Sequence, residues 1–192
     1  MAKVQFQREQ VLEQSTKLFW RVGYHAASMQ QVFQQTGLKP GSVYLAFGNK
    51  QALFKESLAH YAHTTRQGIQ QCLSAASSIE LGICQILDTM LQQSLNSDYC
   101  SCFLVKSQLE FSNEPELQGY VSEQLQQIEA LYAEFLMSLY DEPEAKAKAC
   151  SLMLHIFGIR VYSYHNTGVQ QMRQAVEEGL SWLPWHSFNT QH

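Results

Sequence analysis

Residues 28–50 read SMQQVFQQTGLKPGSVYLAFGNK, and this stretch predicts two short helices joined by a tight turn. Ser28 and Gln31 have the spacing of a capping box, in which each side chain satisfies a backbone donor of the first helical turn. Gly37 ends the first helix, and Pro40 suits the first position of the second because its missing N–H needs no partner there. The stretch therefore has the organisation of a helix-turn-helix.

Longer helices are predicted on both sides of this stretch. Apolar residues recur at helical spacing from Val4 to Val22, and Gly23 then suits a C-terminal cap. Asn49 is a favourable N-cap for the next helix, which we expect to connect the two parts of the chain over residues 49–66. Two short helices braced by two longer ones are typical of a DNA-reading motif. An ordinary αα-corner inside a helical domain has the same spacing.

The charge is distributed unevenly. The chain has a formal net charge of −4, but residues 1–66 contain eight basic and three acidic side chains. The remaining residues contain five basic and fourteen acidic side chains. This asymmetry favours a small cationic module, attracted to phosphates, joined to an acidic body.

Composition disfavours several other classes of protein. No apolar run approaches the roughly 20 residues needed to span a bilayer, and the first residues lack the apolar core of a signal peptide. An odd number of scattered cysteines argues against a secreted disulfide framework, so we expect a cytoplasmic protein with reduced thiols. These residues are Cys72, Cys84, Cys100, Cys102 and Cys150.

The rest of the chain is also predicted to be helical, which makes the fold class all-α. Apolar periodicity predicts helices over residues 79–95, 103–111, 116–140, 144–165 and 169–183. Residues 152–159 are apolar nearly all round, and such a helix must be buried on two sides. We expect one side to face its own domain and the other side to face a second subunit.

Residues 10–62 resemble the DNA-binding domain of the tetracycline-repressor (TetR) family. The positions that carry the resemblance are Leu18, Phe19, Gly23, Tyr24, Ser28, Gly37, Gly41, Ser42, Val43, Tyr44, Phe47, Asn49, Lys50, Leu53 and Phe54. The resemblance implies a homodimer whose C-terminal domain holds an effector pocket and whose affinity for DNA falls when the effector binds. We therefore expect a three-helix helix-turn-helix domain over residues 1–48, the connecting helix, and a larger effector-binding and dimerisation domain over residues 67–192.

The resemblance also implies a set of DNA contacts. Ser28 would cap the second helix near a backbone phosphate, and Tyr44 would contact the DNA backbone. Lys50 would meet a phosphate with the help of the positive end of its helix. Ser42 lies where the family often contacts DNA, and Gly41 matches a position where a side chain would obstruct close approach.

The sequence departs from the family pattern at two positions. Lys39 replaces the usual Ser or Thr cap of the third helix, which adds a cation, and Ala46 replaces a usual Tyr or His, which removes one phosphate contact. We assign base recognition to Lys39 and Leu45. Val43 and Phe47 are assigned to the core because they are apolar.

The segment from Cys100 to Glu110 resembles one branch of the family that includes regulators responsive to electrophiles and oxidants. A thiol at a helix N-terminus favours the reactive thiolate, and Lys106 would add to this effect on Cys102. The alternative is a buried, inert cysteine. A metal site at Cys100 and Cys102 lacks the paired spacing of a zinc module, so we expect no metal or cofactor.

Two further sets of residues are predicted for the C-terminal domain. An apolar or aromatic effector pocket is predicted from Met90, Leu91, Cys102, Phe103, Tyr132, Phe135, His155 and Tyr162. Dimerisation is predicted to use helices 144–165 and 169–183 as a four-helix bundle, through Met153, Ile156, Phe157, Gly158, Val176 and Leu180.

The leading hypothesis is a dimeric repressor that binds a near-palindromic operator in double-stranded DNA. A small-molecule effector or a thiol modification would release it, and no membrane partner is expected. The alternative is an α-helical small-molecule- or partner-binding protein that no longer binds DNA. An enzyme is disfavoured because no acid–base pair, nucleophile–histidine motif or phosphate loop is present in the sequence.

Overall fold

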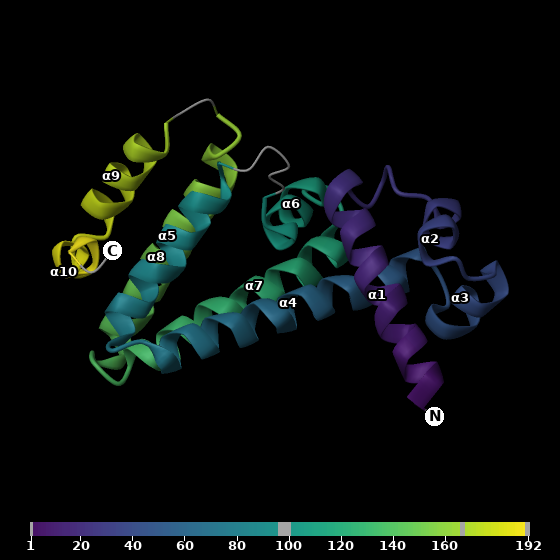
Figure 1. The fold of residues 1–192 in the computed structure, drawn as a ribbon, viewed down its shortest axis with the longest axis horizontal. Helices are drawn as coiled ribbons and strands as arrows, with labels where there is room; N and C mark the ends of the chain where they lie inside the picture. The colour runs from purple at the N-terminus through teal and green to yellow at the C-terminus, as the bar shows by residue number, and fades with distance from the viewer. Residues whose placement is uncertain (1, 96–100, 166–167, 191–192) are drawn as a thin grey trace. The chain divides into compact units, whose positions relative to one another are not determined.

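The computed structural model describes residues 2–95, 101–165 and 168–190, and within these ranges the chain forms ten α-helices and no strand (Figure 1). The helices are α1 (Ala2–Val22), α2 (Met29–Thr36), α3 (Pro40–Phe47), α4 (Lys50–Ala75), α5 (Ile79–Gln93), α6 (Phe103–Glu110), α7 (Pro115–Leu136), α8 (Glu142–Tyr162), α9 (Val169–Gly179) and α10 (Trp185–Asn189). The predicted all-α fold is confirmed. None of the helices in the described ranges is both long enough and apolar enough to cross a membrane.

The chain divides into two compact units. The first contains residues 1–64 and 102–124, and the second contains residues 65–101 and 125–192. This division differs from the predicted domains because residues 102–124, which hold α6 and the start of α7, pack with the N-terminal helices. Helices α4 and α7 each contribute residues to both units.

The core of the first unit is aromatic. Phe54 of α4 is fully buried, and its ring centroid lies 5.3 Å from that of Phe19, 5.6 Å from that of Phe103 and 5.3 Å from that of Phe111. These rings meet edge to face, the arrangement that their quadrupoles favour. Tyr24 joins the cluster, with its centroid 4.9 Å from that of Phe54. The cluster packs α6 against α1 and α4.

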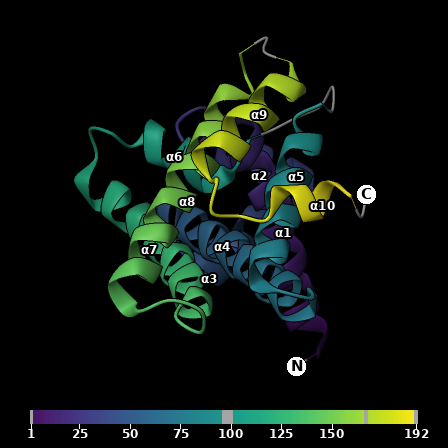
Figure 2. The same ribbon diagram turned by 90° about the vertical axis from the view of Figure 1, so that its left-hand side faces the viewer.

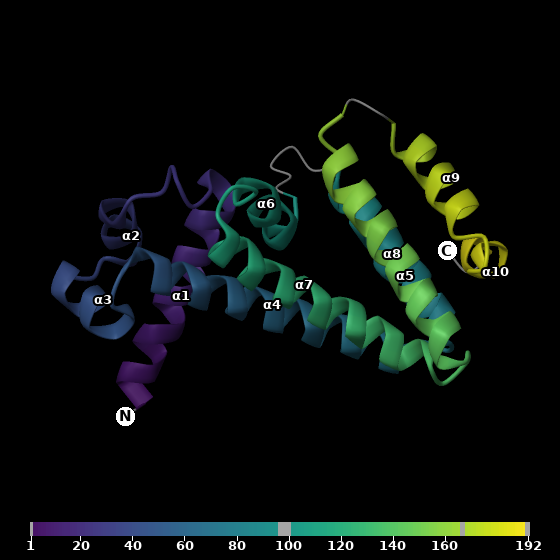
Figure 3. The same cartoon turned by 180° about the vertical axis from the view of Figure 1, so that it is seen from behind.

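The second unit is built on α5 and α8, which run side by side with α9 and α10 beside them (Figures 2 and 3). Arg173 of α9 forms an ion pair with Asp88 of α5. After α9 the chain turns so that Leu180 is fully buried, and the indole Nε1 of Trp185 donates a 2.9 Å hydrogen bond to the Leu180 carbonyl. Helix α10 is therefore held in place by burial and by a satisfied indole donor.

Three predicted helix boundaries differ from those of the structure by four residues or more. The connecting helix continues to Ala75 instead of ending at residue 66, because Ile69 and Leu73 extend its buried face. The helix predicted to end at residue 140 ends at Leu136, since the next apolar residues, Met137 and Leu139, are exposed. The last predicted helix, 169–183, ends at residue 179 and is followed by α10, which was not predicted.

Candidate nucleic-acid interface

The helix ends around the helix-turn-helix form as the sequence predicts. The Ser28 backbone N–H donates to Gln31 Oε1 at 2.8 Å, and the Gln31 N–H donates to Ser28 Oγ at 3.2 Å, which completes the capping box. Gly37 has a left-handed φ of 67° and ends α2. The Ala52 N–H donates to Asn49 Oδ1 at 2.9 Å and caps α4. These local bonds set the directions in which α2, α3 and α4 leave their turns.

Helix α3 has one buried face and one exposed face. Val43 and Phe47 are buried, as predicted, and fix the helix to its unit. Leu45 is 90% exposed and Tyr44 is 45% exposed, while the Tyr44 ring also packs edge to face on Phe33. The remaining residues that were predicted to contact DNA, apart from Lys50 of α4, are also exposed. These are Ser28, Lys39, Gly41 and Ser42. A leucine this exposed on a short helix is suited to contact another molecule.

Lys50 is held differently from the other predicted contacts. Its Nζ atom lies 4.4 Å from the ring centroid of Tyr24, a cation–π geometry. Partial burial lowers the pKa of the Lys50 ammonium, and the negative charge of Glu110 opposes this shift. The ammonium therefore has partners within the protein.

Arg8 positions α3 and was not identified from the sequence. Its Nη1 atom donates a 2.9 Å hydrogen bond to the Ala46 carbonyl, near the C-terminal end of α3. The guanidinium carbon lies 4.5 Å from the Phe47 ring centroid, and the same group forms an ion pair with Glu56. A cation at a helix C-terminus is favourable because the carbonyls there carry partial negative charge. Arg8 therefore links α1, α3 and α4.

Helix α6 is attached to the C-terminal end of α1 by two charged side chains, and these contacts were not predicted from the sequence. Lys106 Nζ donates to the Trp20 carbonyl at 2.7 Å. The Glu110 carboxylate accepts a 3.0 Å hydrogen bond from the Tyr24 N–H and a 2.8 Å bond from the His25 N–H. These backbone groups belong to the turn between α1 and α2, so α6 directly contacts the segment that leads into the helix-turn-helix.

Gly23 allows the close approach of Glu110. Its φ of +85° lies in the left-handed region, where side chains are disfavoured. A Cβ atom at this position would lie 3.0 Å from both Glu110 carboxylate oxygens. Gly23 therefore ends α1, as predicted, and its missing side chain also leaves room for the Glu110 carboxylate.

The cysteines lie in different environments. Cys102 is half-buried at the N-cap of α6, where its side chain makes no capping bond with the residues described, and Cys100 lies outside those residues. Lys106, predicted to favour the Cys102 thiolate, donates to the α1 carbonyl described above. Burial raises the pKa of the Cys84 thiol to about 12. In the described ranges, no cluster of three His, Cys, Asp or Glu side chains is arranged to hold a metal ion.

The eight residues of the predicted effector pocket are divided between the two units, and the pocket stays a prediction. Cys102 and Phe103 belong to the first unit, and Phe103 packs in its aromatic core. The other six belong to the second unit, where they occupy different positions. Leu91 and Tyr132 are buried and Met90 and Phe135 are half-buried, whereas His155 and Tyr162 line a surface groove.

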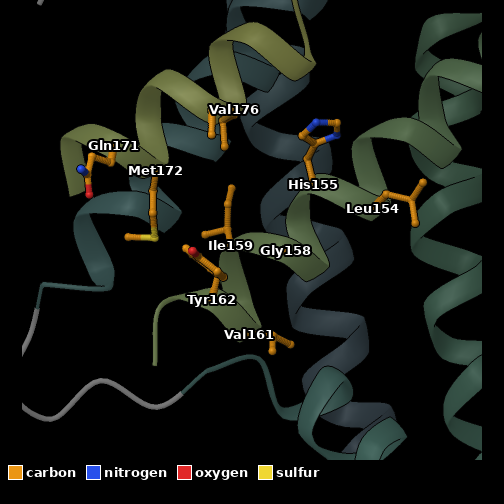
Figure 4. Close-up of a pocket in the computed structure, with 10 residues that line it drawn as sticks. Leu154, His155, Gly158, Ile159, Val161, Tyr162, Gln171, Met172 and Val176 are labelled. Carbon is orange, nitrogen blue, oxygen red and sulfur yellow. The ribbon is translucent and has the colours of Figure 1, made fainter. Parts of the chain in front are cut away.

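This groove, of about 810 Å³, lies between α8 and α9 (Figure 4). The residues that line it are Leu154, His155, Gly158, Ile159, Val161, Tyr162, Gln171, Met172, Ala175 and Val176. Leu154 is 70% exposed, Tyr162 53% and Val161 46%, so the two helices present an apolar surface. Of the predicted dimer residues, Gly158 is exposed and Phe157 is half-buried, whereas Met153, Ile156, Val176 and Leu180 are buried within the chain.

A capped helix-turn-helix with an exposed second helix, in the basic part of the chain, defines the class of DNA-binding proteins that read duplex DNA with a short helix. Comparison with known proteins agrees with this class. Residues 11–57 match the family model described as bacterial regulatory proteins, tetR family. Residues 11–57 are thus similar to the DNA-binding domain of the tetR family, which identifies the chain as a DNA-binding transcriptional regulator.

Its relatives are regulators with the same motif. The HTH-type transcriptional regulator YezE of Bacillus subtilis (strain 168) is 24% identical over 142 residues, which cover 73% of each chain. The HTH-type transcriptional repressor ComR of Escherichia coli (strain K12) is 39% identical over 56 residues, 29% of this chain and 27% of ComR.

The fold extends this similarity to nearly the whole chain. A cysteine mutant of the TetR family transcriptional regulator CifR, complexed with a 26 bp double-strand operator DNA, matches with a TM-score of 0.77 and 24% identity over 91% of this chain and 95% of that chain. The reduced form of E. coli NemR matches with a TM-score of 0.74 and 16% identity over 91% of this chain and 95% of that chain.

Proposed function

We propose that this regulator is a homodimeric repressor that leaves its operator when an effector reaches the C-terminal part of the chain. The observation that carries the proposal is the exposed face of α3, where Leu45 is 90% exposed beside Tyr44 and Ser42. Lys39 and Leu45 would contact base edges in the major groove, while Tyr44, Ser42 and Ser28 would contact the DNA backbone. The repressor role of ComR and the operator complex of CifR support this assignment.

The dimer interface is proposed at the groove between α8 and α9. Contiguous apolar surface of this kind is unfavourable in water and is typical of an interaction site. A Cβ atom at Gly158 would meet nothing within 4 Å in the described part of the chain, so a partner helix could approach closely there. A two-fold axis would place the same groove on both subunits, and the two α3 helices would enter successive major grooves about one helical turn apart.

The trigger is proposed to be an apolar or aromatic effector or a modification of a thiol in the segment before α6. The contacts of Lys106 and Glu110 with the end of α1 support this proposal, because a shift of α6 would act on the turn before α2. A state with poorer spacing between the two α3 helices would lose affinity for both half-sites.

A fluorescence-anisotropy titration against DNA from the protein's own promoter region tests the proposal. We expect sequence-preferring binding that weakens steeply with salt, as phosphate contacts require. Leu45→Ala should reduce the preference for the promoter over random DNA without lowering the melting temperature, whereas Leu109→Ala, at an exposed leucine of α6, is the matched control. A folded protein without preference for any promoter fragment would favour the alternative, a binding protein that has lost its DNA function.

The same titration with diamide separates the two triggers. Release of DNA by diamide, reversed by a reductant and absent in Cys102→Ser, would assign the trigger to that thiol. Binding that ignores diamide would leave a small molecule as the trigger and Cys102 as an inert residue at the start of α6.

A further inference from the structure

Leu45 is the most exposed of the large apolar side chains that the structure describes. Its exposed fraction is 90%, against 70% for Leu154 and 63% for Leu95. An α-helix turns by about 100° per residue, so Leu45, two positions from both Val43 and Phe47, projects from the side of α3 opposite to those two buried residues. Leu45 therefore lies outside the core and extends into solvent.

The residues that precede Leu45 on this face of α3 are small. Residues three and four positions apart are neighbours on a helix surface, and those before Leu45 are Ser42 and Gly41. A Cβ atom at Gly41 would meet nothing within 4 Å in the described part of the chain. The isobutyl group of Leu45 therefore protrudes beyond these neighbours and can enter a groove without obstruction from them.

Contacts of the two residues adjacent to Leu45 hold α3 in place. The Tyr44 ring packs edge to face on Phe33 of α2, with the ring centroids 5.7 Å apart. The carbonyl of Ala46 accepts the 2.9 Å hydrogen bond from Arg8 of α1. These contacts join α3 to two other helices of its unit, so the helix that carries Leu45 has a defined orientation.

A leucine side chain can recognise one kind of group on the base edges of the major groove. Hydrogen-bond donors and acceptors occupy most of these edges, and the 5-methyl group of thymine is their apolar part. Against a donor or an acceptor, leucine would displace water without replacing its hydrogen bond, which is unfavourable. Against the methyl group, both partners remove apolar surface from water, which is favourable. The chemistry of the side chain therefore favours thymine at the position that it contacts.

We propose that Leu45 contacts the 5-methyl group of a thymine in each operator half-site and thereby selects that base. The inference rests on the proposed function and specifies a base that α3 recognises. Lys39, the other residue assigned to base recognition, is an exposed cation and is suited to the acceptor groups of guanine. The two side chains would therefore recognise different bases of the half-site.

DNA fragments with and without thymine methyl groups test the contact. The protein's own promoter fragment is amplified once with dTTP and once with dUTP, because uracil pairs like thymine and differs from it in the 5-methyl group alone. Burial of one methyl group against Leu45 should strengthen binding by about fourfold. Fluorescence anisotropy should therefore show that the proposed dimer, on two half-sites, binds the uracil fragment about 15-fold more weakly than the thymine fragment.

Leu45→Ala separates the methyl contact from other effects of uracil on the duplex. The variant should bind the thymine fragment more weakly than the wild type and should bind both fragments with nearly equal affinity. Leu109→Ala, at a leucine of α6 that is 61% exposed, is the matched control and should keep the wild-type ratio of the two affinities. A Leu45→Ala variant with the wild-type ratio would overturn the inference. Equal wild-type affinity for both fragments would also overturn it, and this comparison is valid even if Leu45→Ala does not fold.

A random-sequence fragment of the same length separates this inference from the proposed function. Wild-type protein that prefers its promoter over random DNA, but binds the thymine and uracil promoter fragments equally, refutes the thymine contact alone. No preference for the thymine promoter fragment over random DNA refutes the proposed function, and the thymine contact with it. Single uracil substitutions along the promoter should identify two sensitive thymines related by the two-fold symmetry of the operator. Sensitivity at no single thymine would contradict the assignment.

Discussion

Replacement of Glu110 by alanine should destabilise the protein through the turn between α1 and α2. The carboxylate accepts hydrogen bonds from the Tyr24 and His25 N–H groups, and bonds to charged groups contribute about 1.5–3 kcal/mol each. His25 is exposed, so water can replace the carboxylate at its N–H, whereas Tyr24 is half-buried. We therefore expect Glu110→Ala to lower the free energy of unfolding by about 2–3 kcal/mol.

A double-mutant cycle with Gly23 isolates the contact. Gly23→Ala alone should cost about 1–2 kcal/mol for a left-handed alanine, with a further cost from the 3.0 Å approach of its Cβ to the carboxylate. In a Glu110→Ala background the second cost disappears while the first remains. The two changes together should therefore be less destabilising than their sum by at least about 0.5 kcal/mol.

Urea unfolding followed by far-ultraviolet circular dichroism measures these free energies. Glu114→Ala is the control, because Glu114 pairs with the His25 side chain at an exposed site and such pairs contribute about 0–1 kcal/mol. A Glu110→Ala variant within about 0.5 kcal/mol of the wild type, or a strictly additive cycle, would refute the reasoning.

Four further outcomes are expected. Arg8→Ala should weaken promoter binding more than Lys17→Ala, measured by anisotropy, because it removes the bond that holds the end of α3; equal losses would contradict this. Lys50→Ala should weaken binding to all sequences and reduce the slope of log affinity against log salt by about one, and an unchanged slope would exclude a phosphate contact. Leu154→Asp should convert the dimer to a monomer in analytical ultracentrifugation without unfolding it, since this side chain is 70% exposed in the single chain. Burial raises the pKa of the Cys84 thiol to about 12, so the buried thiol stabilises the fold fully below the ordinary thiol pKa, and this stabilisation is lost as the pH rises toward 12. Cys84→Ala should therefore reduce the fall in melting temperature at alkaline pH. An unchanged fall would show that this thiol does not cause it.

The parts of the site that depend on local sequence could be predicted. The capping box at Ser28, the left-handed Gly37 and the Asn49 cap each involve residues within a few positions of one another. The buried face of α3 followed from the apolar character of Val43 and Phe47.

Contacts between distant segments could not be predicted. The bond from Tyr24 to Glu110 joins residues 86 positions apart, and the bond from Arg8 to Ala46 joins residues 38 positions apart. From sequence alone, a charged residue on a predicted helix is assigned to the solvent-exposed surface, because its neighbour in space is not known. Periodicity likewise identified Tyr132 and His155 as inward-facing candidates, but it does not specify which helices meet, and the two belong to different parts of their unit.

The sharing of α4 and α7 between the two units has a consequence for protein engineering. The first unit is discontinuous in sequence, and two of its three boundaries, near residues 64 and 124, fall inside uninterrupted helices. A chimaera that exchanged the sensing part would therefore need crossovers within both helices at once. One inserted residue at either crossover would turn the side chains in the rest of that helix by about 100° around the helix axis. Only grafts that preserve the register of both helices would therefore keep the buried faces of α4 and α7 in their original orientation.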